Sequence, residues 1–351
     1  MFLRRLWKTR KCDQNRGRAA LLGPGKRLRI KWASAPVVAL GVLEGVFPQP
    51  ARRLEAALRV RRAPVIISCG VGAPEISAAP VCAQEIALKT DWLSSLSCDR
   101  KTPVPAPALL ELRQGPYRVR LASSETDRLA AFRLRFQVFN LELNEGLETA
   151  YASGYDTDEF DPVCDHLIVE HAGLAKVVGT YRLQSGAMAL ANRGYYSERE
   201  FNFAPYEPLR DHVIELGRAC IHRDHRSTDV LYLLWRGIAR YAIRCGGRYL
   251  VGCCSLTSQD PGHGAAVYQA LKDYLVDPAL QTHPKPQFAM PLVNIPGADS
   301  HLPKLQRTYL AIGAKICGPP AIDREFKTID FLTLLDLEKL HPRISARFLK
   351  P

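Results

Sequence analysis

Apolar residues recur at regular intervals from residue 117 to residue 335, and their spacing predicts alternating strands and helices. Residues 117–121 alternate between apolar and polar side chains, as in a strand. Ser124 and Asp127 stand at the spacing of a helix N-cap and the third residue of its helix. The helix that follows carries apolar side chains at offsets of three and four, which would face a core: Leu129, Phe132, Phe136, Phe139 and Leu143.

Two β-rich runs, residues 166–170 and 176–183, are joined through Ala172-Gly173 and predict a hairpin. A further strand is expected at residues 213–221. Ser227 or Thr228 would then cap a helix that continues to about Cys245 and ends at Gly246-Gly247. Its inward positions would be Leu231, Leu234, Ile238 and Ala242.

The last part of the chain predicts an apolar strand at residues 249–256, a helix at 265–275 and a strand at 329–335. Taken in order, these elements predict an α/β layer fold with a mixed central sheet flanked by helices.

The first hundred residues lack this periodicity and carry most of the charge. Through Arg100 there are 18 Lys or Arg and 7 Asp or Glu, so this part carries +11 of the total net charge of +13. A proline-rich segment, residues 102–107, reads as an extended linker. We therefore expect residues 1–105 to form a basic, largely unstructured extension and residues 106–351 to form the folded domain. The extension could also be an arm for nucleic acid or anionic lipid.

Membrane spans, disulfides and metal sites all lack a clear signature. No stretch of 18 apolar residues occurs, and the apolar run at residues 35–46 lies too far from Met1 for a signal peptide. The ten cysteines include no C-x-x-C pair, and Cys253 and Cys254 read as buried thiols. His222 and His225 lack a third ligand at a convincing spacing. We expect no metal and a cytoplasmic location, and peripheral contact with the membrane stays open.

An acidic loop precedes the predicted hairpin, with Asp156, Asp158, Glu159, Asp161 and Asp165. It could hold a cationic amine, or it could be a solvated turn. A calcium loop of the EF-hand type would need a glycine and a later bidentate Glu that are missing here.

Glu215 and Arg218 lie inside an apolar strand, where two charges need partners. An offset of three places them on opposite faces of a regular strand. Gly217 between them suggests a bulge, which would bring both side chains to the same face. They could form a buried ion pair, or Glu215 could act as a base whose pKa is raised by burial.

Residues 221–230 join this strand to the next helix and could bind a phosphate at the helix start, helped by Arg223 and Arg226. Three arginines at intervals of four form a stripe on the helix that follows: Arg236, Arg240 and Arg244. The stripe could dock an acidic carrier protein or simply face solvent. No nucleophile is expected, since a G-x-S-x-G motif is missing and Cys220 should be buried.

Several motifs in order resemble those of one family, the GNAT-fold N-acyltransferases of the ornithine–acyl carrier protein type, which make lyso-ornithine lipid. The likeness covers about residues 117–275 and extends to the N-acyl amino acid synthases and, more distantly, the acyl-homoserine lactone synthases. The motifs are Arg135-x-x-x-Phe139, Asp156-x-Asp158-x-x-Asp161, CDHLIV from Cys164, GTYRL ending at Leu183, YYSEREF from Tyr195, ELGRACIH from Glu215, and Leu234-Trp235.

This resemblance implies a GNAT-like fold and transfer of a fatty or 3-hydroxy fatty acyl group from acyl carrier protein to the α-amine of an amino acid, with ornithine as the expected acceptor. The phosphopantetheine thioester would be a co-substrate, with no bound cofactor and no nucleic acid partner. Glu215 and Arg218 would be catalytic, Glu215 as a base or water-positioning group. The acceptor would be bound by Asp156, Asp158, Asp161, Arg182, Arg135 and Phe139. The donor would be bound by Cys220, Ile221, His222, Arg223, Arg226 and Ser227, with backbone N–H groups near residues 219–221 polarising the thioester.

One departure concerns the donor. Many GNAT enzymes have a glycine-rich phosphate loop after this strand, whereas this loop reads HRDHRSTDV. A carrier-protein donor fits that loop better than tight binding of coenzyme A. The alternatives are a homoserine lactone synthase, an N-acyl amino acid synthase with another acceptor, and a non-catalytic scaffold whose basic extension binds nucleic acid or membrane.

Overall fold

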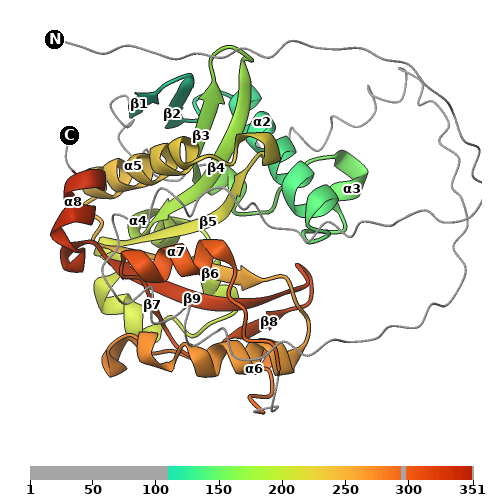
Figure 1. Cartoon of the computed structure of the whole chain (residues 1–351), viewed down its shortest axis with the longest axis vertical. Coiled ribbons are helices and arrows are strands. Elements are labelled where there is room, and N and C mark those ends of the chain that lie inside the picture. Colours follow the sequence, from blue (N-terminus) through green and yellow to red (C-terminus); the bar gives the residue numbers. More distant parts are fainter. Residues whose placement is uncertain (1–109, 294–297, 350–351) are drawn as a thin grey trace, which may run out of the picture. The chain divides into compact units, whose positions relative to one another are not determined.

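A mixed β-sheet forms the centre of the protein in the computed structural model, which describes residues 110–293 and 298–349 (Figure 1). The described residues contribute nine strands to it: β1 (Glu111–Gln114), β2 (Tyr117–Leu121), β3 (Asp165–His171), β4 (Lys176–Ser185), β5 (Val213–Ile221), β6 (Tyr249–Leu256), β7 (Lys315–Ile316), β8 (Ala321–Asp323) and β9 (Thr328–Asp336). Their order is β1-β2-β3-β4-β5-β6-β9-β7, with β8 paired to β9. The expectations for residues 1–105 lie outside the described residues.

Neighbouring strands are antiparallel except β5 and β6. The parallel pairing of these two strands covers only Val213 to Glu215 against Tyr249 to Val251. Beyond these residues both strands continue without pairing to each other, β5 to Ile221 and β6 to Leu256. The sheet therefore opens between β5 and β6.

Seven α-helices lie in the described residues: α2 (Glu125–Phe136), α3 (Ala150–Ser153), α4 (Gly186–Ala191), α5 (Thr228–Arg244), α6 (Pro261–Ala270), α7 (Lys304–Ile312) and α8 (Pro342–Phe348). A π-helical turn, Gln137–Glu142, continues α2. Ser124 caps α2 through the predicted capping box with Asp127, and Ser227 caps α5. None of the described helices is both long and apolar enough to cross a bilayer.

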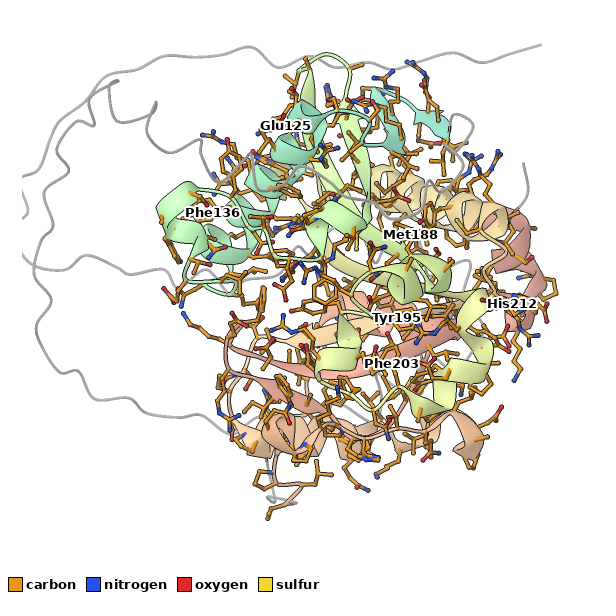
Figure 2. All side chains as sticks on the ribbon, turned by 180° about the vertical axis from the view of Figure 1, so that it is seen from behind. Glu125, Phe136, Met188, Tyr195, Phe203 and His212 are labelled. Atoms are coloured by element: carbon orange, nitrogen blue, oxygen red, sulfur yellow. The ribbon has the colours of Figure 1, made fainter. Side chains whose placement is uncertain are left out.

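Alternating side chains divide the sheet into two faces. On β3, Leu167 and Val169 belong to the core under α5, whereas Ile168 packs with α2 on the other face. Viewed from behind, the chain from Met188 through Tyr195 and Phe203 to His212 runs across the sheet (Figure 2). Tyr195, Phe201, Phe203 and Tyr206 pack there with Val213, Val251 and Leu332. This second face carries the candidate site.

The central elements lie where the sequence predicts them, including strands at 117–121, 213–221 and 249–256. Two details of the prediction are wrong. Leu231 is partly exposed, because Val230 and Leu233 occupy the buried side of α5. The helix expected at 265–275 starts at Pro261, capped by Asp260, and ends at Ala270.

Candidate functional site

Three arginines and three aspartates form a buried ion network that fixes the acidic loop. Arg135 on α2 contacts Asp156 at 2.6 Å and Asp161 at 2.7 Å. Arg182 on β4 contacts Asp158 at 2.6 Å and Asp161 at 3.2 Å, and Arg218 on β5 contacts Asp158 at 2.6 Å. All six side chains are at most 7% exposed. The network thus ties together α2, the loop and two neighbouring strands.

The arginines keep these carboxylates ionised although they are buried. Burial alone would raise the pKa of Asp158, but ion pairing with Arg182 and Arg218 lowers it well below its usual range. The same balance, with Arg135, lowers the pKa of Asp161 to about 2. Because each carboxylate already has a guanidinium partner, the network orders the loop, and the carboxylates are not open to a cationic amine in this conformation.

A β-bulge interrupts the pairing of β4 with β5. Thr180 is opposite Cys220 and Arg182 is opposite Gly217, so β5 has one extra residue in this interval. The residue with a left-handed backbone is Arg218, with φ of 51°, whereas Gly217 has no positive φ. The bulge is therefore present as the sequence suggests, but Arg218 and not the glycine carries its unusual conformation.

Glu215 does not pair with Arg218, so the alternative of a direct buried ion pair is wrong. Its carboxylate accepts the backbone N–H of Tyr196 at 2.8 Å and that of Ser197 at 2.7 Å. Glu215 is 5% exposed, and burial raises its pKa in spite of these two hydrogen bonds. Arg218 instead lies over the rings of Tyr196 and Phe326. Tyr196 therefore contacts both residues, Glu215 through its backbone N–H and Arg218 through its ring.

The ladder between β5 and β6 ends at Glu215 and Val251, although the Leu216 carbonyl oxygen still lies close to Gly252. Leu216 to Ala219 are partly exposed there, and the edge of β5 that faces β6 has no ladder partner. Unpaired backbone groups at a strand edge can hydrogen-bond an extended ligand.

The junction after β5 differs in part from the expected donor site. The Arg226 guanidinium donates hydrogen bonds to both carboxylate oxygens of Glu142, and its Nε donates to the Ile221 carbonyl oxygen. Cys220 is buried in the core beside α2, and burial raises the pKa of its thiol, so it is not a reactive thiolate. His222 contacts the Lys176 ammonium at 3.0 Å. Of the six residues expected to bind the acyl donor, only Arg223 has a mainly exposed side chain (75%).

The remaining predicted residues also have structural roles. Phe139 packs partly buried against the core beside α2. Ser227 accepts the Val230 N–H as the cap of α5. On the outer side of α5, Arg236 and Arg240 are partly exposed and Arg244 is exposed. The basic stripe is thus present on the surface.

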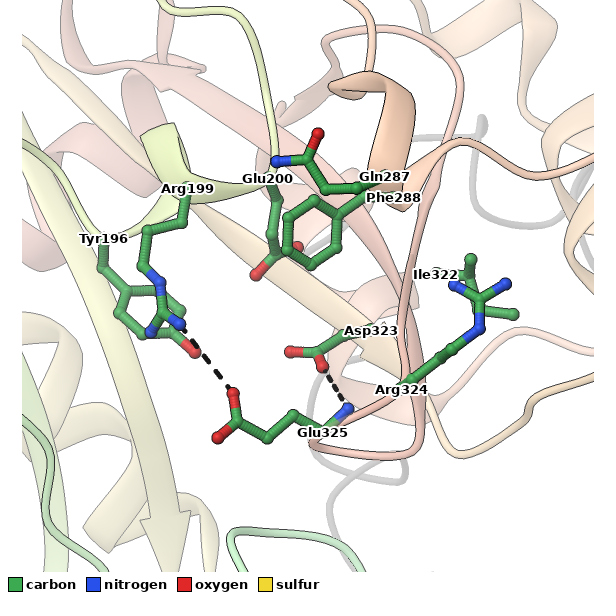
Figure 3. Close-up of a pocket in the computed structure, with 9 residues that line it drawn as sticks. All are labelled: Tyr196, Arg199, Glu200, Gln287, Phe288, Ile322, Asp323, Arg324 and Glu325. Atoms are coloured by element: carbon green, nitrogen blue, oxygen red, sulfur yellow. Dashed lines mark hydrogen bonds and ion pairs between the residues drawn. The ribbon is translucent and has the colours of Figure 1, made fainter.

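A small pocket adjoins this site that the sequence-based interpretation missed. Its volume is about 270 Å³, and it is lined by Tyr196, Arg199, Glu200, Gln287, Phe288, Ile322, Asp323, Arg324 and Glu325 (Figure 3). Its residues come from three segments far apart in the chain. The YYSEREF motif is the sequence feature that points to this pocket, because it supplies Tyr196, Arg199 and Glu200.

Comparison with known proteins identifies similar chains. A family model described as an acetyltransferase (GNAT) domain matches residues 134–236. An L-ornithine N(alpha)-acyltransferase of Brucella abortus (strain 2308) is 33% identical over 259 residues, which cover 69% of this chain and 90% of the relative. An L-ornithine N(alpha)-acyltransferase of Rhodobacter capsulatus is 30% identical, covering 64% of this chain and 91% of the relative.

Among solved structures, FeeM, an N-acyl amino acid synthase from uncultured soil microbes, aligns with a TM-score of 0.38 and 11% identity. The alignment covers 64% of this chain and 92% of that protein.

Proposed function

Since the chain belongs to the L-ornithine N(alpha)-acyltransferase family and is an acyltransferase with a GNAT domain, we propose that it joins a fatty acyl group to the α-amine of L-ornithine. The observation that carries this proposal is the likeness to the ornithine acyltransferases over most of their length. The product would be an N-acyl ornithine of the kind expected in lyso-ornithine lipid synthesis.

The reaction requires no nucleophile from the protein. The amine nitrogen attacks the thioester carbonyl carbon, an N–C bond forms, and the C–S bond breaks. The proton lost by the amine ends on the departing sulfur. The protein therefore has to supply a proton acceptor, donors for the carbonyl oxygen and correct positioning.

Glu215 is the proposed proton acceptor, directly or through water. Its raised pKa and its position where β5 and β6 separate support this assignment. Its hydrogen bonds to the N–H groups of Tyr196 and Ser197 also hold that turn in place. Glu215 is thus proposed both to accept the proton and to shape the acceptor side of the site.

Arg218 is proposed to bind the acceptor's α-carboxylate. Its Nη2 donates to Asp158, and its buried Nε lies 3.7 Å from Asp156 Oδ1 without forming a hydrogen bond. An unsatisfied guanidinium N–H beside the site favours an anionic ligand. Asp156, Asp158, Asp161, Arg135 and Arg182 would act indirectly, by ordering the loop against this residue.

The donor is proposed to be an acyl thioester of acyl carrier protein. The phosphopantetheine arm would lie along the open edge of β5, with backbone N–H groups near residues 219–221 facing the carbonyl oxygen. Support comes from the glycine-free junction, the exposed Arg223 and the basic stripe on α5, which suit an acidic protein.

Reconstituted acyl transfer tests the proposal. The full chain is incubated with 3-hydroxyacyl-acyl carrier protein and L-ornithine, and the products are identified by mass spectrometry. An N(alpha)-acyl ornithine is expected. Formation of a lactone from S-adenosylmethionine, or the lack of an amide with any amino acid from folded protein, would refute it.

A further inference from the structure

The pocket beside Tyr196 is rich in buried carboxylates. Glu200 is 2% exposed and Asp323 is 5% exposed, and the close-up shows both carboxyl groups turned toward the space between Tyr196 and Phe288 (Figure 3). Asp330, also 5% exposed, has a carboxylate oxygen within 4.8 Å of one on Glu200 but does not line the pocket. Of these three acidic groups, Glu200 and Asp323 line a pocket of about 270 Å³, together with Arg199 and Arg324.

In the described part of the chain no Lys, Arg or His forms an ion pair with these carboxylates, although the charge of Arg199 partly offsets the rise in the pKa of Glu200. Arg199 on the pocket wall lies instead near two exposed carboxylates, at 3.9 Å from Glu159 and 3.8 Å from Glu325. Asp330 Oδ1 is buried and has no hydrogen-bond partner. This arrangement contrasts with the neighbouring ion network, in which arginines and aspartates are equal in number.

Burial raises the pKa of two of these acidic groups. Burial, with Asp330 and Asp323 nearby, raises the pKa of Glu200 well above its usual range, and burial raises that of Asp330 to about 6. A buried acidic cluster without a cation is costly unless it is protonated or meets a positive ligand. The cluster therefore favours a cation that enters from the pocket.

We propose that this pocket binds the side-chain ammonium of the amino acid acceptor, with Glu200 as its main partner and Asp323 as the second. This assignment rests on the proposed function, since ornithine carries a second amine at the end of its side chain. Drug-sized ligands occupy pockets of roughly 300–1,000 Å³, so the smaller volume here suits a single amino acid.

The position of the pocket relative to Glu215 supports this orientation. Ser197, whose N–H is bound by Glu215, begins the turn Ser197–Arg199, and Glu200 follows it. Cys253 Sγ lies 3.5 Å from Ser197 Oγ and 4.0 Å from Glu200 Oε2. The acceptor could therefore direct its α-amine toward Glu215 and its side-chain ammonium toward Glu200.

A metal ion suits the cluster less well than an ammonium. Glu200, Cys253 and Asp330 offer ligand atoms within 4.8 Å of one another. A metal would need the Cys253 thiolate, but burial raises the pKa of that thiol well above its usual range. An ammonium needs only carboxylate acceptors, which the pocket supplies.

Comparison of L-ornithine with L-norvaline, which lacks the side-chain amine, tests the proposal. We expect wild-type protein to prefer ornithine and Glu200→Gln to raise the KM for ornithine about 10- to 100-fold, without changing the KM for the acyl donor. The same substitution should leave the KM for norvaline nearly unchanged. Asp323→Asn provides a second variant, and Glu338→Gln, an exposed carboxylate paired with Arg248, is the matched control.

Ornithine binding without donor gives an independent readout, because a ligand that binds the folded state raises its thermal stability. Ornithine should raise the Tm of the wild type more than norvaline does, and this difference should vanish in either pocket variant. Equal use of ornithine and norvaline by the wild type would overturn the pocket assignment but leave acyl transfer standing. Loss of the ornithine preference on treatment with a chelator would also overturn it, in favour of a metal. No amide with either amino acid would refute the proposed function itself.

Discussion

Arg135 on α2 and Asp161 in the acidic loop form a buried ion pair with two hydrogen bonds. Arg135 Nη1 donates to Asp161 Oδ1 at 2.7 Å, and Nη2 donates to Oδ2 at 2.9 Å, with both side chains 1% exposed. The loop that this pair fixes connects α3 to β3, and Asp158 within it contacts Arg182 and Arg218. The stability of the loop and the placement of Arg218 are therefore linked.

Arg135→Met should destabilise the protein strongly, because Asp156 would lose its hydrogen-bonded partner and Asp161 would keep only Arg182 as a cationic partner. Breaking a buried pair from one side costs roughly 3–5 kcal/mol in the free energy of unfolding. Urea unfolding measures this quantity. Arg113→Met, which removes the exposed pair with Glu111, is the control and should cost at most about 1 kcal/mol. Similar losses for the two variants would contradict the structural role of the buried network.

Two glycines on neighbouring strands should respond differently to substitution by alanine. A Cβ on Gly217 would meet Arg182 Nε at 3.9 Å, an ordinary contact, whereas a Cβ on Gly252 would lie 2.2 Å from the Leu216 carbonyl oxygen. Gly217→Ala should change the free energy of unfolding by less than about 1 kcal/mol. Gly252→Ala should lower it by about 1–3 kcal/mol or more. Thermal unfolding of both variants measures the difference, and a larger cost at Gly217 would contradict the bulge geometry.

That bulge illustrates how far sequence-based reasoning reaches. Two charges and a glycine within an apolar strand indicate an irregularity, because regular alternation cannot accommodate them. The left-handed conformation at Arg218 and its hydrogen bond to Asp158, 60 positions away in the chain, could not be predicted from the local sequence. Likewise, Glu215 was a candidate base from its burial in a strand, but its hydrogen bonds to the Tyr196–Ser197 turn depend on tertiary packing.

Short elements and composite sites were beyond prediction for a related reason. β7 and β8 have two and three residues, too few for any period to appear. The pocket combines Tyr196 to Glu200 with Gln287 and Asp323, and only the fold brings these segments together. The long apolar strand β6 and the capped helix α5 were predictable because their signals are local.

His166 should make the protein sensitive to mild acid. Burial lowers its pKa from 6.5 to about 4, so between these values the unfolded chain binds a proton that the folded protein does not. The free energy of unfolding should therefore fall as the pH decreases from 6.5 to 4. The effect of His166 should be roughly 2–3 kcal/mol.

The comparison with His166→Gln isolates this contribution. Glu200 and Asp330 have raised pKa values and oppose the trend, but they do so equally in both proteins. Urea unfolding at intervals from pH 7 to pH 4 should show a smaller loss of stability in the variant. Parallel curves for the two proteins would show that His166 is not responsible.

The basic stripe on α5 should matter for a protein donor but not for a small one. Replacing Arg236, Arg240 and Arg244 together by Gln should raise the KM for acyl-acyl carrier protein about tenfold at low salt, and less at high salt, because screening weakens the wild-type attraction. The KM for an acyl-pantetheine thioester should stay the same. Arg113→Gln serves as the control for loss of surface charge. A parallel rise in KM for both donors would argue against docking of the carrier protein on α5.

Glu215→Gln should lower kcat by about 100- to 10,000-fold, the usual contribution of a positioned proton acceptor. The amide keeps one oxygen for the turn but cannot accept a proton from the amine. In the wild type, burial raises the pKa of Glu215, and only the ionised form is a base, so the rate should rise as the pH increases through that raised value. This limb of the pH profile should be missing in the variant. Urea unfolding of the same variant separates proton transfer from the structural role of Glu215. If the variant is less stable but its rate still rises with pH as in the wild type, Glu215 holds the Tyr196–Ser197 turn without taking part in proton transfer.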